Sequence, residues 1–138
     1  MSNTTTPALK SNILVVDDTP LNLRLLTIIL DKQGYTTHSV SNGEAAIQFV
    51  ETHLPELILL DIMMPGMDGY KVCEKLKLNE RTRDIPIIFI SALSDVVDKI
   101  KAFSVGGVDF ITKPFQLEEV LARVETHLTL RRLQLSLQ

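Results

Sequence analysis

Short apolar runs alternate along the chain with segments of helical periodicity, and this alternation is the strongest constraint on the fold. The runs 13–16, 57–60 and 87–90 are apolar throughout, which is typical of strands buried on both faces of a parallel sheet. We expect strands at 12–16, 35–40, 57–60, 86–90 and 108–112, and helices at 20–33, 44–52, 70–78, about 95–105 and from just after Pro114. This order, with right-handed crossovers, predicts an α/β fold with a doubly wound five-stranded parallel sheet.

The length of 138 residues suits one domain with a substantial core, which we place at residues 12–128. Residues 1–11 lack the apolar stretch of a signal peptide and are expected to be a disordered lead. No stretch is apolar over the length of a membrane span, so we expect a cytoplasmic protein that does not enter a membrane. The net charge of −3, without a basic stripe, predicts no direct contact with nucleic acid, and the single Cys73 excludes an intramolecular disulfide.

The last predicted helix carries two apolar stripes on nearly opposite faces. The first stripe is expected to pack on the sheet and consists of Leu117, Val120, Leu121, Val124 and Leu128. The second stripe points away from the sheet and consists of Leu130, Leu133 and Leu137. Residues 129–138 are therefore expected either to fray or to extend the helix as a linker, a coiled-coil start or a contact with a second copy.

Polar side chains follow the predicted strands at the ends where a parallel sheet binds its ligands. Asp17 and Asp18 follow the first strand, Asp61 the third, Ser91 the fourth and Lys113 the fifth. Neighbouring carboxylates raise one another's pKa, and a hard cation such as Mg²⁺, which prefers oxygen ligands, compensates their charge. Carboxylates, Mg²⁺, an ammonium group and a hydroxyl suit phosphoryl transfer, in which an aspartate can be the nucleophile.

The polar residues that follow the strands also have other interpretations. An aspartate after a strand is often a helix cap, and a lone lysine is usually a surface residue, but their shared place at one rim argues against coincidence. An aspartate-nucleophile phosphatase would carry a second aspartate two residues after its nucleophile at the end of the first strand, where this chain has Thr19. A nucleotide-binding module would need a glycine-rich turn there, and residues 17–20 contain no glycine.

Four separated motifs carry a resemblance to a known family over residues 12–128: ILVVDD at 13–18, LLDIMMPGMDG at 59–69, IFISA at 88–92 and GVDFITKPF at 107–115. With these motifs the chain resembles the receiver domain of bacterial two-component response regulators. The resemblance implies a flavodoxin-like sheet with strand order 2-1-3-4-5 and five helices. It also implies a phosphorelay signalling domain that catalyses only its own Mg²⁺-dependent phosphorylation and dephosphorylation. A degenerate receiver that only binds partners is disfavoured, because every functional position is occupied.

The resemblance assigns roles to the residues of the rim. Asp61 is the phosphoacceptor and becomes a 4-aspartylphosphate. Mg²⁺ is held by Asp18 directly, by Asp17 through water, by Asp61, and by the backbone carbonyl of Met63. Lys113 contacts the phosphoryl group, and its peptide bond to Pro114 is expected to be cis.

The same resemblance predicts how the signal leaves the site. Ser91 moves to hydrogen-bond the phosphoryl oxygen, and the Phe110 ring swings inward behind it. The phosphoryl donor is a phosphohistidine of a histidine kinase or phosphotransfer protein. A homodimer is a further hypothesis, through the C-terminal helix or through the face of the fourth helix, fifth strand and fifth helix, where ion pairs would use Lys99, Asp109, Glu119 and Arg123. We interpret His38, His53 and His127 as surface or packing residues.

Overall fold

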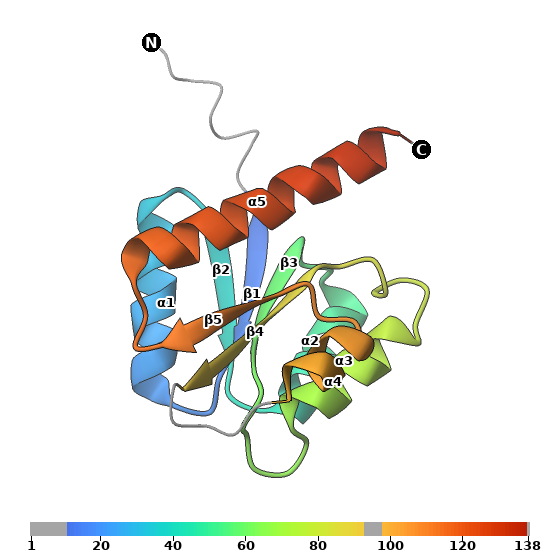
Figure 1. The fold of residues 1–138 in the computed structure, drawn as a ribbon, viewed down its shortest axis with the longest axis horizontal. Coiled ribbons are helices and arrows are strands. Elements are labelled where there is room, and N and C mark those ends of the chain that lie inside the picture. The colour runs from blue at the N-terminus through green and yellow to red at the C-terminus, as the bar shows by residue number, and fades with distance from the viewer. Residues whose placement is uncertain (1–10, 93–97, 138) are drawn as a thin grey trace.

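The computed structural model describes residues 11–92 and 98–137, which form one parallel sheet with helices on both faces (Figure 1). The sheet order is β2-β1-β3-β4-β5, so the predicted α/β fold and strand order are confirmed. The strands are β1 (Asn12–Val16), β2 (Thr36–Val40), β3 (Leu57–Asp61), β4 (Ile87–Ala92) and β5 (Asp109–Lys113). The helices are α1 (Pro20–Lys32), α2 (Gly43–Thr52), α3 (Gly69–Lys77), α4 (Lys99–Ser104) and α5 (Leu117–Ser136).

Each face of the sheet carries its own core. Helices α1 and α5 cover one face, and α2, α3 and α4 cover the other (Figure 1). Successive side chains of a strand point to opposite faces, so Ile58 and Leu60 join one core while Leu57 and Leu59 join the other. All five residues of β3 are buried, and each such aliphatic side chain contributes about 1.5–3 kcal/mol through burial. The apolar runs of the sequence are thus the central strands.

The fourth helix is shorter than predicted. Helix α4 begins at Lys99 and ends at Ser104, whereas we expected it over about 95–105; positions 95–97 lie outside the described residues. Asp98 is not helical but caps the helix, because its side-chain oxygen accepts a hydrogen bond from the backbone N–H of Lys101 at 2.9 Å. Since Asp98 can satisfy this orphan N–H only from outside the helix, the described helix begins one residue after it.

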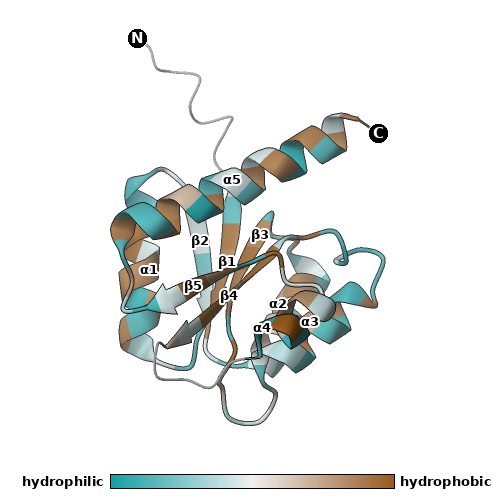
Figure 2. Cartoon of the chain, in the orientation of Figure 1, coloured by the Kyte–Doolittle hydropathy of each residue, from teal (hydrophilic) through white to brown (hydrophobic). Residues whose placement is uncertain are grey.

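Of the two alternatives for residues 129–138, the structure shows a continued helix: α5 extends past the sheet and is helical through Ser136 (Figure 1). Leu130, Leu133 and Leu137 of the second stripe are all exposed, and Figure 2 shows hydrophobic bands along these last turns. In the first stripe, Val120, Val124 and Leu128 are buried. The placement of Leu117 in the core was wrong: it is 49% exposed, because the side chains that pack on the sheet begin one turn later.

Two arginines anchor the last turns of α5 to the domain. The guanidinium of Arg131 donates to the backbone carbonyl of Asp84, and that of Arg132 donates to the hydroxyl of Ser11. Ser11 was expected in the disordered lead, but it is buried, and its carbonyl accepts a hydrogen bond from the backbone N–H of Thr36. The folded domain therefore begins at least one residue earlier than predicted, and residues 1–10 lie outside the described part.

No helix within residues 11–92 and 98–137 combines the length and the apolar character that crossing a membrane would require.

Gly69, the first residue of α3, lies against the end of β3. A Cβ atom there would lie 2.4 Å from the carbonyl oxygen of Asp61 and 2.8 Å from the Cα of Ile62. Because both atoms are backbone and cannot move aside cheaply, Gly69→Ala is expected to lower the free energy of unfolding by about 2–3 kcal/mol. Gly66→Ala is the matched control: its Cβ meets no atom, and the φ of +76° alone should cost about 1 kcal/mol. Urea unfolding measures both, and equal losses would contradict this packing argument.

Candidate functional site

The strand register brings the predicted site residues to one rim of the sheet. Val16 pairs with Leu60, so Asp17, the next residue after β1, lies beside Asp61 at the end of β3. Asp61 in turn pairs with Ile90 of β4, which places Ser91 one step further along the neighbouring strand. Because the strands are parallel, their carboxyl ends meet at this rim. Three central strands therefore each contribute a polar side chain to the same place.

Three carboxylates gather at the rim. One oxygen from each of Asp17, Asp18 and Asp61 can be chosen so that all lie within 4.8 Å of one another. Asp17 and Asp61 are buried, whereas Asp18 is exposed. Three negative charges this close repel strongly unless a cation compensates them. The arrangement is thus electrostatically incomplete by itself.

Asp17 is oriented by its own loop. Its Oδ1 accepts hydrogen bonds from the backbone N–H of Thr19 at 2.9 Å and from the Asn22 side chain at 3.4 Å. Its Oδ2 is buried and accepts no hydrogen bond from the described residues, although the ammonium group of Lys113 lies 3.3 Å from it as an ion pair. A buried carboxylate oxygen without a hydrogen bond is costly, and a cation is the partner that suits it. Thr19 and Asn22 were not predicted to matter, and only their spacing of two and five residues after Asp17 could have indicated it.

Lys113 supplies a positive charge to the cluster from the end of β5. Its Nζ lies 3.3 Å from Oδ2 of Asp17 and 3.5 Å from Oδ2 of Asp61, and its side chain is 19% exposed. The peptide bond from Lys113 to Pro114 is cis, as predicted. One ammonium group against three carboxylates leaves the rim with an excess of negative charge.

The pKa of Asp61 reflects both its burial and this excess of negative charge. Burial, and next the carboxylate of Asp17, raise the pKa of Asp61 to about 7, while Lys113 and a hydrogen bond from the backbone N–H of Met63 act in the opposite direction. An aspartate nucleophile must be ionised, so in the absence of a metal a large share of Asp61 is unreactive at neutral pH. A cation bound at the rim would restore its charge.

The donor set fits Mg²⁺. Carboxylate oxygens are the ligands that this ion prefers, and Oδ2 of Asp17 accepts no hydrogen bond within the described part of the chain. Asp17, Asp18 and Asp61 would hold the ion. Met63 was predicted to contribute its backbone carbonyl. Its backbone lies beside the carboxylate of Asp61, because the Met63 N–H donates a hydrogen bond to Oδ1 of Asp61 at 3.3 Å.

The two predicted switch residues lie on neighbouring strands. Ser91 is buried near the end of β4, and Thr112 of β5 is paired with it. Phe110 is half-buried toward α4, with its ring 5.9 Å from that of Phe89 and 5.5 Å, edge-on, from that of Phe103. The Phe110 ring thus contacts the core and helix α4 at once.

The charged residues of β5 and α5 form ion pairs and hydrogen bonds within one chain that were not predicted. Arg123 pairs with Asp109 at 2.8 Å and with Glu119 at 3.4 Å within one chain. His127, for which no partner was foreseen, has its Nε2 2.9 Å from the other oxygen of Asp109. Burial raises the pKa of Asp109, but hydrogen bonds from His127, from the backbone N–H of Phe110 and from Arg123, together with the charge of Arg123, outweigh it and hold the pKa below the ordinary value. The four-residue spacing of Arg123 and His127 on one helix face was the available signal.

Comparisons with known proteins agree with this geometry. Residues 13–125 match the model of the response regulator receiver domain family. The chain is 42% identical over 112 residues to the DNA-binding dual master transcriptional regulator RpaA of Synechocystis, covering 81% of this chain and 46% of that protein. It is also 42% identical over 118 residues to the response regulator PleD of Caulobacter vibrioides, covering 86% of this chain and 26% of that protein. The chain thus spans less than half the length of either relative.

Solved structures show the same architecture. The signal receiver domain of a signal transduction histidine kinase from Syntrophus aciditrophicus superposes with a TM-score of 0.79 at 39% identity, over 86% of this chain and 90% of that one. NtrX from Brucella abortus superposes with a TM-score of 0.86 at 27% identity, over 93% of this chain and 29% of that one. With the family model, the sheet order and the acidic rim in agreement, this chain belongs to the response regulator receiver domain family, a family of signalling domains.

Proposed function

We propose that Asp61 accepts a phosphoryl group from the phosphohistidine of a histidine kinase or phosphotransfer protein. The observation that carries this proposal is the rim itself, where Asp61 lies with Asp17, Asp18 and Lys113 at the carboxyl ends of the central strands. An Oδ of Asp61 attacks the phosphorus, the N–P bond breaks, and the imidazole leaves with the bonding electrons and takes up a proton. Hydrolysis by water then breaks the new O–P bond and returns the carboxylate and inorganic phosphate.

The surrounding residues prepare this carboxylate. Asp17, Asp18, Asp61 and the carbonyl of Met63 would hold Mg²⁺, which supplies positive charge for the phosphoryl oxygens and keeps Asp61 ionised. The ammonium group of Lys113 is already 3.5 Å from Asp61 and would exchange part of this ion pair for the phosphoryl group. Thr19 and Asn22 keep Asp17 in place while the charge at the rim changes.

The signal would leave through Ser91 and Phe110. A new phosphoryl group adds about two negative charges and draws the Ser91 hydroxyl toward Asp61. Phe110 is a phenylalanine and has no hydroxyl to hydrogen-bond, so a move of its ring changes its burial and its contact with the Lys99 ammonium group, which lies 5.8 Å from the ring centroid. Its contacts with Phe89 and Phe103 link this change to α4, and burial of a phenylalanine, about 1.5–3 kcal/mol, suffices to bias two arrangements.

We further propose that a second copy of this chain is a partner. A homodimer through α4, β5 and α5 would use Lys99, Asp109, Glu119 and Arg123, and it would have to exchange the pairs that Arg123 makes within one chain. The exposed Leu130, Leu133 and Leu137 offer a second contact along α5. We propose a cytoplasmic protein whose receiver portion makes no direct contact with nucleic acid; RpaA, named as DNA-binding, extends well beyond the matched region.

Incubation with acetyl phosphate tests the proposal. With Mg²⁺ present, intact-protein mass spectrometry should show the gain of one phosphoryl group, which hydroxylamine removes because it is an acyl phosphate. With EDTA in place of Mg²⁺ the gain should fall to background, because the three carboxylates then lack their cation. Equal labelling in Mg²⁺ and EDTA, or a label stable to hydroxylamine, would contradict the proposal.

A further inference from the structure

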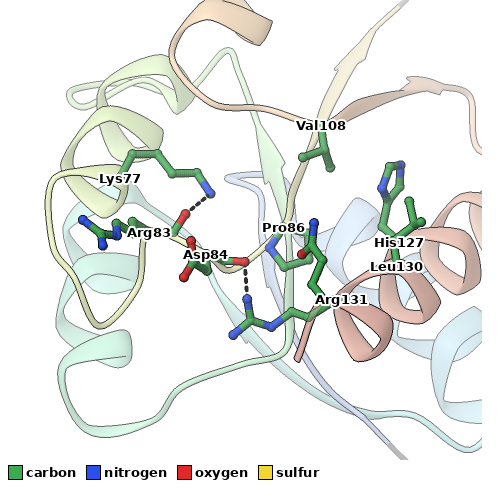
Figure 3. Close-up of a pocket in the computed structure, with 9 residues that line it drawn as sticks. Lys77, Arg83, Asp84, Pro86, Val108, His127, Leu130 and Arg131 are labelled. Carbon is green, nitrogen blue, oxygen red and sulfur yellow. Dashed lines mark hydrogen bonds between the residues drawn. The ribbon is translucent and has the colours of Figure 1, made fainter. Parts of the chain in front are cut away.

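A pocket lies at the end of the sheet opposite to Asp61. It has a volume of about 480 Å³ and opens between α5 and the segment that joins α3 to β4 (Figure 3). Pro86 and Val108 on its wall directly precede β4 and β5, so the pocket lies at the amino-terminal ends of the strands, whereas the acidic rim lies at their carboxyl ends. None of its lining residues belongs to the acidic rim.

Positive side chains dominate the charges of this pocket. Lys77, Arg83 and Arg131 line it, against the single carboxylate of Asp84. The Nζ of Lys77 donates to the backbone carbonyls of Arg83 at 2.8 Å and Ile85 at 2.7 Å, and Arg131 donates to that of Asp84 (Figure 3). Carbonyl oxygens satisfy hydrogen bonds but do not neutralise charge. Among residues 11–92 and 98–137, no ion pair joins these three cations to a carboxylate.

Lys77 is half-buried among the other charged groups of the pocket. Burial lowers the pKa of Lys77, the charges of Cys73 and Asp84 act in the opposite direction, and the positive charge of Arg131 acts with burial. A half-buried ammonium group without a carboxylate at ion-pair distance is stabilised by an anion that binds beside it. Unused N–H groups remain for such an anion, because Lys77 makes two of its three hydrogen bonds and Arg131 has one hydrogen bond in the described residues.

The rest of the wall indicates what accompanies the anion. Pro86, Val108 and Leu130 give it apolar surface, and His127 and Gln134 add polar groups (Figure 3). The volume lies within the range of pockets that hold small molecules, roughly 300–1,000 Å³. Three cations and one carboxylate leave a surplus of two positive charges, which matches a dianion better than a single carboxylate. Arginine also binds phosphate oxygens in a bidentate manner.

We propose that this pocket binds a phosphate monoester that carries a small apolar group, at a site separate from Asp61. The phosphate lies beside Lys77 and Arg131, and the apolar group lies against Pro86, Val108 and Leu130. Arg83 is exposed at the margin of the pocket, where Figure 3 shows its guanidinium directed away from Arg131. Because Arg131 and Leu130 belong to α5 while Lys77 and Arg83 belong to α3 and the segment after it, such a ligand bridges these two parts of the domain. The proposal does not depend on the phosphoacceptor role of Asp61.

Phenyl phosphate is the probe, titrated into the ¹⁵N-labelled protein in EDTA and followed by amide chemical shifts. Saturable shifts are expected at the amides of Val108, His127, Leu130 and Arg131 and not at those of Asp61 and Met63. Arg131→Gln removes one charged hydrogen-bond donor and should weaken binding about tenfold. Arg83→Gln is the second variant, because Arg83 is exposed and its side chain makes no hydrogen bond or ion pair with another described residue that folding would lose; it should weaken binding severalfold.

Arg24→Gln is the matched control, because Arg24 is exposed on α1 and the charge change is the same. It should leave the affinity within about twofold, since long-range effects of one exposed charge are screened by salt. Asp61→Asn should bind phenyl phosphate as the wild type does. The proposal is overturned by the absence of saturable shifts, by shifts centred on Asp61, by equal weakening in Arg24→Gln and both pocket variants, or by phenol binding as well as phenyl phosphate.

Discussion

Asp61→Asn is expected to take up no phosphoryl group from acetyl phosphate and Mg²⁺ under conditions in which the wild-type chain takes up one. The amide has nearly the shape of the carboxylate, but it is not a nucleophile toward phosphorus at neutral pH. Since the Asp61 side chain is buried at the end of a fully buried strand, the variant should keep the fold while losing the reaction. Intact-protein mass spectrometry measures the loss directly.

The control for this experiment is Asp68→Asn. Asp68 lies at the end of the loop that follows β3, close in sequence to Asp61. It caps α3, because its side chain accepts a hydrogen bond from the backbone N–H of Lys71 at 2.9 Å. Asparagine caps helices as well as aspartate does, so this variant should remain folded and be labelled like the wild type. If Asp61→Asn is labelled and Asp68→Asn is not, the acceptor has been assigned to the wrong aspartate.

The second large effect is on stability as a function of pH in metal-free buffer. The pKa of Asp61 is about 7 in the folded protein and 3.8 ordinarily, so between these values the folded state holds a proton that the unfolded state has released. The stabilisation from this proton is therefore fully present below pH 3.8 and is lost as the pH rises through about 7. The loss should amount to about 2–4 kcal/mol in the free energy of unfolding, measured with urea in EDTA.

Asp61→Asn isolates this contribution, because the amide cannot titrate. The difference in free energy of unfolding between the variant and the wild type should grow in favour of the variant from pH 4 to pH 8, since only the wild type gains a buried negative charge. Other acids, such as Asp109, whose pKa is lowered, titrate in both proteins and cancel in the difference. If the free energies of unfolding of the two proteins change in parallel over this pH range, the raised pKa of Asp61 is contradicted.

Much of the candidate site was predictable from the sequence, because the residues that follow parallel strands all lie at the same edge of the sheet. An apolar run of four that ends in a polar residue, as before Asp17 and Asp61, delivers that residue to the carboxyl edge whatever the details of packing. The strand boundaries were correct to within two residues for the same reason, and the cis bond at Lys113–Pro114 followed from the family resemblance.

Other features depended on contacts between distant parts of the chain. The two ion pairs of Lys113, with Asp17 and with Asp61, and the bond between His127 and Asp109 each join residues that the sequence does not show as neighbours. The misplaced Leu117 shows the same limit, because helical periodicity states which residues share a face but not where along the helix the sheet lies.

The sequence by itself determined the layer architecture, the strands and the identity of the residues at the acidic rim. These depend on local patterns of apolar and polar residues, which the chain carries in its order. Only the tertiary structure decided how the charges balance: that Lys113 is shared by two aspartates, and that Lys77, Arg83 and Arg131 line one pocket in which none of them forms an ion pair with a carboxylate of the described residues. The physical reason is that electrostatic energy depends on distance and burial, and both arise only when α5 and the segment after α3 close over the same edge of the sheet.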